Sequence, residues 1–166
     1  MEKFLNRLID TRYKYINEEN NKDYVSSNLA PFYANDGPSP PIVLIKELGV
    51  NCAGLCNLCR KYRNLSIPTY NSYYGGTEAY FTFFEKEEID YEKNYPNLTL
   101  LLYDYNPIDQ GHLAIVFDKT DRPLKDQKII HAKGWKDFKV VHEILSDDPV
   151  NINKYTHIVK AKDWLD

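Results

Sequence analysis

The stretch Gly49-Val50-Asn51-Cys52-Ala53-Gly54-Leu55-Cys56 has the pattern of a capped helix start that carries a thiol. Asn51 has the short amide side chain that caps a helix by accepting a bond from a backbone N–H two or three residues on. The pattern therefore predicts a helix that begins after Asn51, with Cys52 in its first turn. At that position the free N–H groups and the positive end of the helix dipole favour a thiolate over a thiol.

Two histidines fall on runs that are typical of strands. His112 opens the apolar part of Gln110-Gly111-His112-Leu113-Ala114-Ile115-Val116-Phe117, and His131 lies in Lys128-Ile129-Ile130-His131-Ala132. We expect these runs to be neighbouring strands. A cysteine at a helix N-terminus together with histidines on strands is the arrangement that makes a thiolate nucleophile with an oriented base.

The connection between the two strands predicts their register. A loop over residues 119–124 sets an antiparallel pairing in which His112 faces His131. Such partners share a face of the sheet, with Cβ atoms roughly 5 Å apart. The same register makes two favourable pairs, Asp118 with Lys125 and Leu113 with Ile130. We therefore expect His112 to act as the general base for Cys52, and His131 to orient His112 and fix its tautomer.

Helical patterns dominate the first half of the chain and strand patterns the second. Apolar spacing predicts a helix over 2–17, and a helix over 78–86 is expected behind a cap at Thr77, while 42–48 fits a helix or a strand. Strands are expected over 98–105, 112–118 and 128–132, with at least one more near Val140 or 156–160. This order makes an α+β domain in which N-terminal helices, including the helix of Cys52, pack on an antiparallel β-meander.

The composition bounds the domain organisation and the partners. With 166 residues, 43% of them hydrophobic, the chain is expected to form one domain over 1–166, in which 1–24 make an N-terminal helix and a polar linker. A net charge of -3 argues against nucleic acid as a partner. Neither a signal peptide nor a membrane span is apparent, so we expect no membrane partner and a cytoplasmic or otherwise unexported protein. Three cysteines cannot form an even disulfide framework, which favours a reduced compartment.

Three short motifs resemble those of the NlpC-type cell-wall cysteine peptidases, a papain-like family. Residues 51–55 resemble the family's Asp-Cys-Ser-Gly-Leu/Phe signature, residues 111–116 look like its Gly-His-Val-Gly/Ala-Ile strand, and residues 130–132 look like its Ile/Val-His-Ala segment. The resemblance covers about residues 30–135 in outline. It implies a papain-like fold, a triad of Cys52, His112 and His131, and peptidoglycan-like peptide substrates, typically the γ-D-glutamyl to diamino-acid bond.

The chain departs from the family pattern at several positions. Asn51 and Ala53 replace the usual Asp and Ser, and the loop between the histidines is longer than is typical. Tyr33 is the candidate for the tyrosine with which the family lines its pocket. Tyr74 and Gly76 are further candidates for substrate binding, although aromatic residues around a turn are more often packing residues.

The cysteine spacing also has other interpretations. Cys52, Cys56 and Cys59 have the spacing of radical enzymes with an iron–sulfur cluster, but the chain is too short for their barrel. One helix is a poor source of tetrahedral zinc ligands, and cysteines on one helix face are commonly small buried hydrophobic residues. We therefore expect no metal or cofactor, structural roles for His142 and His157, and a monomer. Two alternatives to a cysteine peptidase stay open: a silent papain-like binding or structural module, and an acyltransferase or isopeptidase acting on a non-wall substrate.

Overall fold

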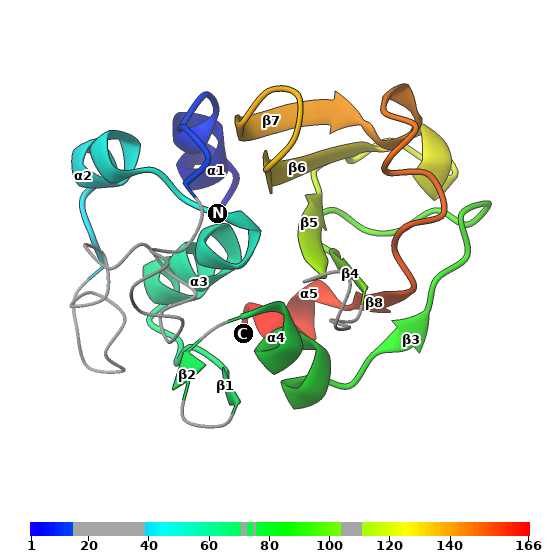
Figure 1. The fold of residues 1–166 in the computed structure, drawn as a ribbon. Coiled ribbons are helices and arrows are strands. Elements are labelled where there is room, and N and C mark those ends of the chain that lie inside the picture. Colours follow the sequence, from blue (N-terminus) through cyan, green and yellow to red (C-terminus); the bar gives the residue numbers. More distant parts are fainter. Residues whose placement is uncertain (15–38, 71–72, 75, 104–110) are drawn as a thin grey trace.

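The structure is a computed structural model that describes residues 1–14, 39–70, 73–74, 76–103 and 111–166. Helices from the N-terminal part pack on a six-stranded antiparallel sheet, so the α+β class is confirmed (Figure 1). The helices are α1 Glu2–Leu8, α2 Ile42–Leu48, α3 Cys52–Tyr62, α4 Thr77–Phe83 and α5 Ala161–Trp164, with 3-10 turns η3 Leu124–Asp126 and η4 Leu145–Asp147. The strands are β1 Thr69–Tyr70, β2 Tyr73–Tyr74, β3 Glu87–Glu88, β4 Leu100–Tyr103, β5 His112–Val116, β6 Lys128–Lys133, β7 Lys139–Ile144 and β8 His157–Val159.

The large sheet has the strand order β3-β8-β4-β5-β6-β7, and every neighbouring pair is antiparallel. Strands β4 to β7 form the expected meander, and β8 returns to pair with the free side of β4. Strands β1 and β2 form a separate hairpin. Tyr103, the last residue of β4, pairs with His112, the first residue of β5. His112 therefore lies at one end of this strand pair.

Both faces of the sheet are covered, which is why the central strands β4 and β5 are apolar at almost every position. Leu113, Ile115 and Ile130 face a core that α1 and α3 close. Ala114, Val116 and Ile129 face a second core that includes Leu145 and Tyr155. In Figure 1 the helices α1 to α3 lie on one side of the sheet, and the orange-to-red segment between β7 and β8 runs along the other. Because side chains alternate along a strand, His112 and His131 point to the side of the second core.

Two of the expected helices differ from the observed ones. The helix predicted over 2–17 ends at Leu8, because Asp10 adopts a positive φ of 66° and Arg12 then makes a β-bridge with Lys139. The chain there joins the edge of β7 instead of continuing as a helix. The segment 42–48, which fitted a helix or a strand, is α2. The N-cap of α4 is Gly76 and not Thr77, and α4 ends at Phe83.

The predicted register of β5 and β6 is wrong by two residues. Ile115 pairs with Ile130 and Val116 pairs with Ile129, instead of Leu113 with Ile130 and Asp118 with Lys125. The connection is longer than expected, because it includes η3 and because the Asp118 carboxylate accepts the backbone N–H of Lys128 at 2.9 Å. An even shift keeps every side chain on its face. His112 and His131 therefore share a face, but as diagonal neighbours and not as direct partners.

Candidate active site

The start of α3 places Cys52 as the sequence predicts. Asn51 is the N-cap, and its side-chain oxygen accepts the backbone N–H of Gly54 at 2.7 Å. A Cβ on Gly54 would lie 2.9 Å from Cγ2 of Val50 and 3.0 Å from Oδ1 of Asn51, so a larger residue would disturb the cap. Cys52 is consequently the first residue of the helix, at its positive end.

The expectation that this position makes Cys52 a thiolate is wrong in this structure. The residue is only 9% exposed, and burial raises the pKa of its thiol to about 11. The backbone N–H groups of Leu113, Ala53 and Cys52 itself, and the charge of Lys154, act in the opposite direction but are outweighed. The removal of solvent therefore dominates over the helix terminus, and the resting form at neutral pH is the thiol.

Cys56 and Cys59 lie deeper than Cys52 on the same helix. Both are buried, and burial raises the pKa of each thiol well above its usual value. They belong to the core between α3 and the sheet, as expected for small hydrophobic residues. Among the three cysteines, Cys52 thus has the thiol that ionises most easily.

The sulfur of Cys52 approaches β5 next to His112. The backbone N–H of Leu113, one residue after His112, is the first of the groups that lower the pKa of Cys52. Two groups of the segment between β7 and β8 act on both side chains. The charge of Lys154 lowers the pKa of Cys52 and of His112. Burial raises the pKa of Tyr155, and Cys52 raises it further. The ring centroid of Tyr155 lies 6.2 Å from that of His112. Cys52 and His112 therefore share one environment at the start of β5.

A continuous chain of hydrogen bonds runs from His112 to Glu143. Nε2 of His112 lies 2.8 Å from Nδ1 of His131, and Nε2 of His131 lies 2.8 Å from Oε1 of Glu143 on β7. The same carboxylate accepts Nδ2 of Asn151 at 2.9 Å and Nζ of Lys133 at 3.1 Å. The structure thus brings together the two histidines predicted from the sequence and adds an acidic residue that the sequence analysis did not identify.

The protonation states along this chain follow from burial and charge. Burial, with the charges of His131, Lys154 and Lys133, holds the pKa of His112 well below its usual value. Burial also lowers the pKa of His131, although the hydrogen bond to Glu143 opposes it. For Glu143 the hydrogen bonds from His131 and Lys133 overcome burial and bring its pKa down to about 2. At neutral pH two neutral imidazoles therefore stand before an ionised carboxylate.

A buried lysine holds the carboxylate end of the chain. Lys133 is 2% exposed, and its ammonium group lies 3.1 Å from Glu143 and 2.5 Å from Asp148, which is equally buried. Asp148 also accepts the indole N–H of Trp135 at 2.9 Å. The Trp135 ring packs against His112, with ring centroids 5.0 Å apart. The charged network thus also positions the Trp135 ring beside His112.

The structure describes the three candidate substrate-binding residues, Tyr33, Tyr74 and Gly76, to different extents. Tyr33 lies outside the described residues, and Tyr74 belongs to β2 but its side chain is not described. Gly76 precedes α4, whose first residue Thr77 borders the site, because a Cβ on Gly111 would lie 3.0 Å from Oγ1 of Thr77. The structure thus brings the start of α4 beside the residue that precedes His112.

Glu143 carried a weak signal in the sequence. It stands in the strand-like run Lys139–Ile144, two residues after Val141, which pairs with His131. A charged residue on the same strand face as a candidate histidine is a candidate partner for it. The pairing of β6 with β7 is needed to find it, and that pairing was not predicted.

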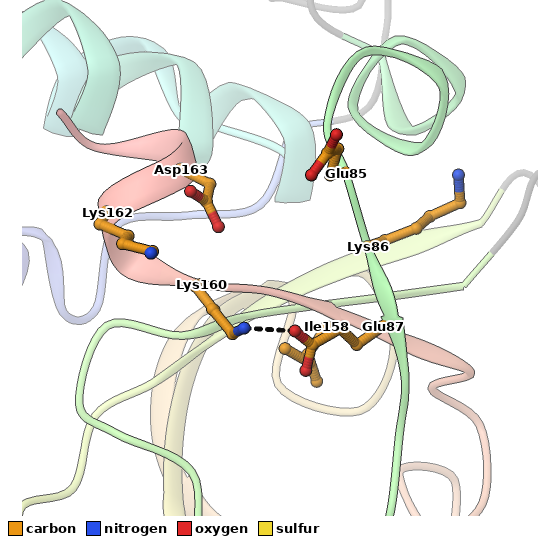
Figure 2. Close-up of a pocket in the computed structure, with 7 residues that line it drawn as sticks. All are labelled: Glu85, Lys86, Glu87, Ile158, Lys160, Lys162 and Asp163. Atoms are coloured by element: carbon orange, nitrogen blue, oxygen red, sulfur yellow. Dashed lines mark ion pairs between the residues drawn. The ribbon is translucent and has the colours of Figure 1, made fainter.

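A charged hollow lies at the opposite end of the sheet (Figure 2). Lys160 forms an ion pair with Glu87 across it. Lys160 follows Val159, which pairs with Leu100 at the start of β4, whereas His112 pairs with Tyr103 at the end of that strand. The hollow is therefore separate from the cysteine and the histidines. It is lined by Glu85, Lys86, Glu87, Ile158, Lys160, Lys162 and Asp163.

No model of a known protein family matches the chain, and no curated protein matches its sequence. Within the described ranges, no helix is both long enough and apolar enough to cross a lipid bilayer. In the same part of the chain, no group of three His, Cys, Asp or Glu side chains is arranged to hold a metal ion. The functional conclusion therefore rests on the geometry around Cys52 and His112.

Proposed function

We propose that this chain is a papain-like thiol hydrolase that cleaves an amide bond with Cys52 as nucleophile, His112 as general base and His131 as the orienting residue. One observation carries the proposal. The hydrogen-bonded chain from His112 through His131 to Glu143 begins one residue before the backbone N–H that faces the Cys52 sulfur. A helix that begins with the cysteine and packs on strands that carry the histidines also agrees with an NlpC-type fold.

In the proposed reaction the two nitrogens of His112 have different partners. Because Nε2 is bonded to His131, Nδ1 is the nitrogen that takes the thiol proton. The Cys52 sulfur attacks the carbonyl carbon while its proton moves to Nδ1, which avoids a free thiolate in a buried site. His112 then gives the proton to the leaving amine, and a thioester remains on Cys52. Water then attacks the thioester carbon and gives a proton to His112. The C–S bond breaks, the carboxylic acid leaves, and His112 returns the proton to the sulfur of Cys52.

The first turn of α3 supplies donors for the oxyanion. The Gly54 N–H is already bonded to Asn51, whereas the N–H groups of Cys52 and Ala53 face the sulfur. We assign the Cys52 N–H to the oxyanion hole, since it lies beside the atom that forms the new bond. Such donors gain strength in a site from which water is excluded.

The substrate class follows from the reaction and from the resemblance. The family pattern implies peptides of the bacterial wall, cleaved at the γ-D-glutamyl bond, and these are the first substrates to assay. A peptide, isopeptide or other acyl substrate outside the wall requires the same nucleophile and base. Tyr33, Tyr74 and Gly76 are the residues proposed to contact it.

A specific observation favours a second candidate, a papain-like binding module without turnover. The Cys52 thiol has a pKa of about 11 and is 9% exposed, whereas an efficient cysteine nucleophile needs to lose its proton. In a module of this kind the cysteine and both histidines would be structural. The two candidates differ in whether Cys52 can be acylated.

An activated ester separates the two candidates. With p-nitrophenyl acetate, the hydrolase should release a burst of about one p-nitrophenolate per chain and carry the acetyl group on Cys52. Cys52→Ala should abolish the burst, and Cys59→Ala, a buried cysteine on the same helix, should retain it. A burst that is equal in wild type and Cys52→Ala, or an acetyl group mapped elsewhere, would contradict the hydrolase and leave the binding module.

A further inference from the structure

We propose that Glu143 is a positioning residue that fixes the tautomers of both imidazoles and so leaves the lone pair of His112 on Nδ1, the nitrogen to which the proposed function assigns the Cys52 proton. The inference deepens the proposed function and rests on it only for what that lone pair does. Glu143 reaches His112 through His131, and its hydrogen bonds within the described residues are to His131, Asn151 and Lys133.

The protonation state of the Glu143 carboxylate determines which hydrogen bonds it can make. An ionised carboxylate accepts hydrogen bonds and donates none. Glu143 accepts hydrogen bonds from Nδ2 of Asn151 and Nζ of Lys133, and Nε2 of His131 lies 2.8 Å from its Oε1. Lys133 is 2% exposed and positively charged, which makes protonation of the carboxylate unfavourable.

The ionised carboxylate determines where the protons lie on His131 and His112. Since Glu143 only accepts, the proton of neutral His131 is on Nε2 and its Nδ1 is an acceptor. His112 must then donate to that Nδ1 from its own Nε2, 2.8 Å away. A neutral imidazole with its proton on Nε2 has its lone pair on Nδ1. A single acidic residue thus determines which nitrogen of His112 acts as the base.

The same hydrogen bonds persist when His112 becomes positively charged. When His112 takes the thiol proton, it keeps its Nε2–H bond to His131, and no hydrogen bond of the chain has to reverse. The positive charge formed on His112 is opposed by Lys154 and Lys133, while the Glu143 carboxylate favours a positive charge on the neighbouring His131. Asp148, which pairs with Lys133, reduces that opposition. The charged groups that act on the two imidazoles therefore come from β6, from β7 and from the segment between β7 and β8, and the rings of Tyr103 on β4 and of Tyr155 also lie beside His112.

The tautomers can be measured directly in the wild-type protein. Long-range 1H–15N correlation spectra of the histidine-labelled full chain near pH 7.5 should show a protonated Nε2 and a bare Nδ1 for both His112 and His131. Spectra of His112→Ala and His131→Asn assign the signals. A proton on Nδ1 of His112 would overturn the inference, whatever the activity of the protein.

The variant Glu143→Gln tests the charge. We expect the rate of Cys52 acetylation to fall about 10- to 100-fold, as is usual when a supporting partner is removed. The acid limb of its pH profile should move to lower pH, because the variant loses the charge that raises the pKa of His131. The matched control is Glu87→Gln, which also removes a lysine-paired carboxylate from this sheet but leaves the histidines untouched.

The outcomes separate this inference from the proposed function. A folded Glu143→Gln protein that acetylates as fast as Glu87→Gln overturns the positioning role. Wild-type protein with the expected tautomers but no acetylation of Cys52 supports the role of Glu143 and contradicts the hydrolase. An acetylated Cys52 together with a proton on Nδ1 of His112 does the reverse.

Discussion

Nε2 of His112 lies 2.8 Å from Nδ1 of His131, although the register of β5 and β6 offsets the two residues by two positions. Diagonal neighbours on one face of an antiparallel pair are about 7–8 Å apart at the backbone, which a pair of imidazoles can bridge. On the other side of β6, His131 pairs with Val141 of β7, so Glu143 is its diagonal neighbour and accepts Nε2 of His131 at 2.8 Å. Three neighbouring strands, β5, β6 and β7, therefore contribute to one hydrogen-bonded chain.

Cys52 should be the first of the three cysteines to react with iodoacetamide. Its pKa of about 11 makes the reaction slow at neutral pH, and the rate should rise with pH up to that value because the thiolate is the reactive form. Cys56 and Cys59 are buried, and their thiols ionise less easily. Peptide mapping after brief treatment checks the order, with Cys52→Ser as the control. Earlier modification of Cys56 or Cys59 would contradict the assignment.

Lys133 and Lys136 each form an ion pair with Asp148, but substitutions at the two lysines should differ sharply in their effect on stability. Lys133 is 2% exposed and Lys136 is 57% exposed. Lys133→Met leaves two carboxylates without their buried counter-charge and should lower the free energy of unfolding by about 3–5 kcal/mol. Lys136→Met should cost at most about 1 kcal/mol, because its ion pair is open to solvent. Urea unfolding measures both, and similar losses in the two variants would refute this view of the network.

The buried histidines should make stability depend on pH in a defined direction. Burial lowers the pKa values of His112 and His131 below their usual 6.5, so the unfolded chain binds protons first as the pH falls. Stability should therefore be highest above pH 6.5 and fall below it, by up to about 1.4 kcal/mol per pH unit for each histidine. Glu143, with a pKa of about 2, adds a further loss only below pH 4.5. Urea midpoints at pH 7.5 and 5.5 check the sign, and an equal or higher midpoint at pH 5.5 would contradict it.

The features set by local sequence were predictable. The cap at Asn51 depends on one side chain and a backbone N–H three residues away, and the structure confirms it. The apolar runs around His112 and His131 form the strands expected of them. The shared face of the two histidines survived a wrong register only because the error was even, since strand side chains alternate with a period of two.

The features set by distant contacts were not predictable from the sequence. The register of β5 and β6 depends on the turn that Asp118 makes with Lys128. The end of α1 depends on the bridge between Arg12 and Lys139, residues far apart in the chain. The raised pKa of Cys52 follows from the depth at which α3 packs, which no local pattern indicates.

The relative activities of three variants test most directly how Cys52, His112 and His131 share the reaction. In steady-state hydrolysis of p-nitrophenyl acetate, Cys52→Ala should be inactive, and His112→Ala should lose about 10²- to 10⁴-fold because the base is gone. His131→Asn should lose only about 10- to 100-fold, since asparagine can still hydrogen-bond His112 and takes no part in the covalent steps. Activity in His112→Ala together with an inactive His131→Asn would mean that the histidines have exchanged roles. Equal activity in all three variants would show that Cys52 is not the nucleophile.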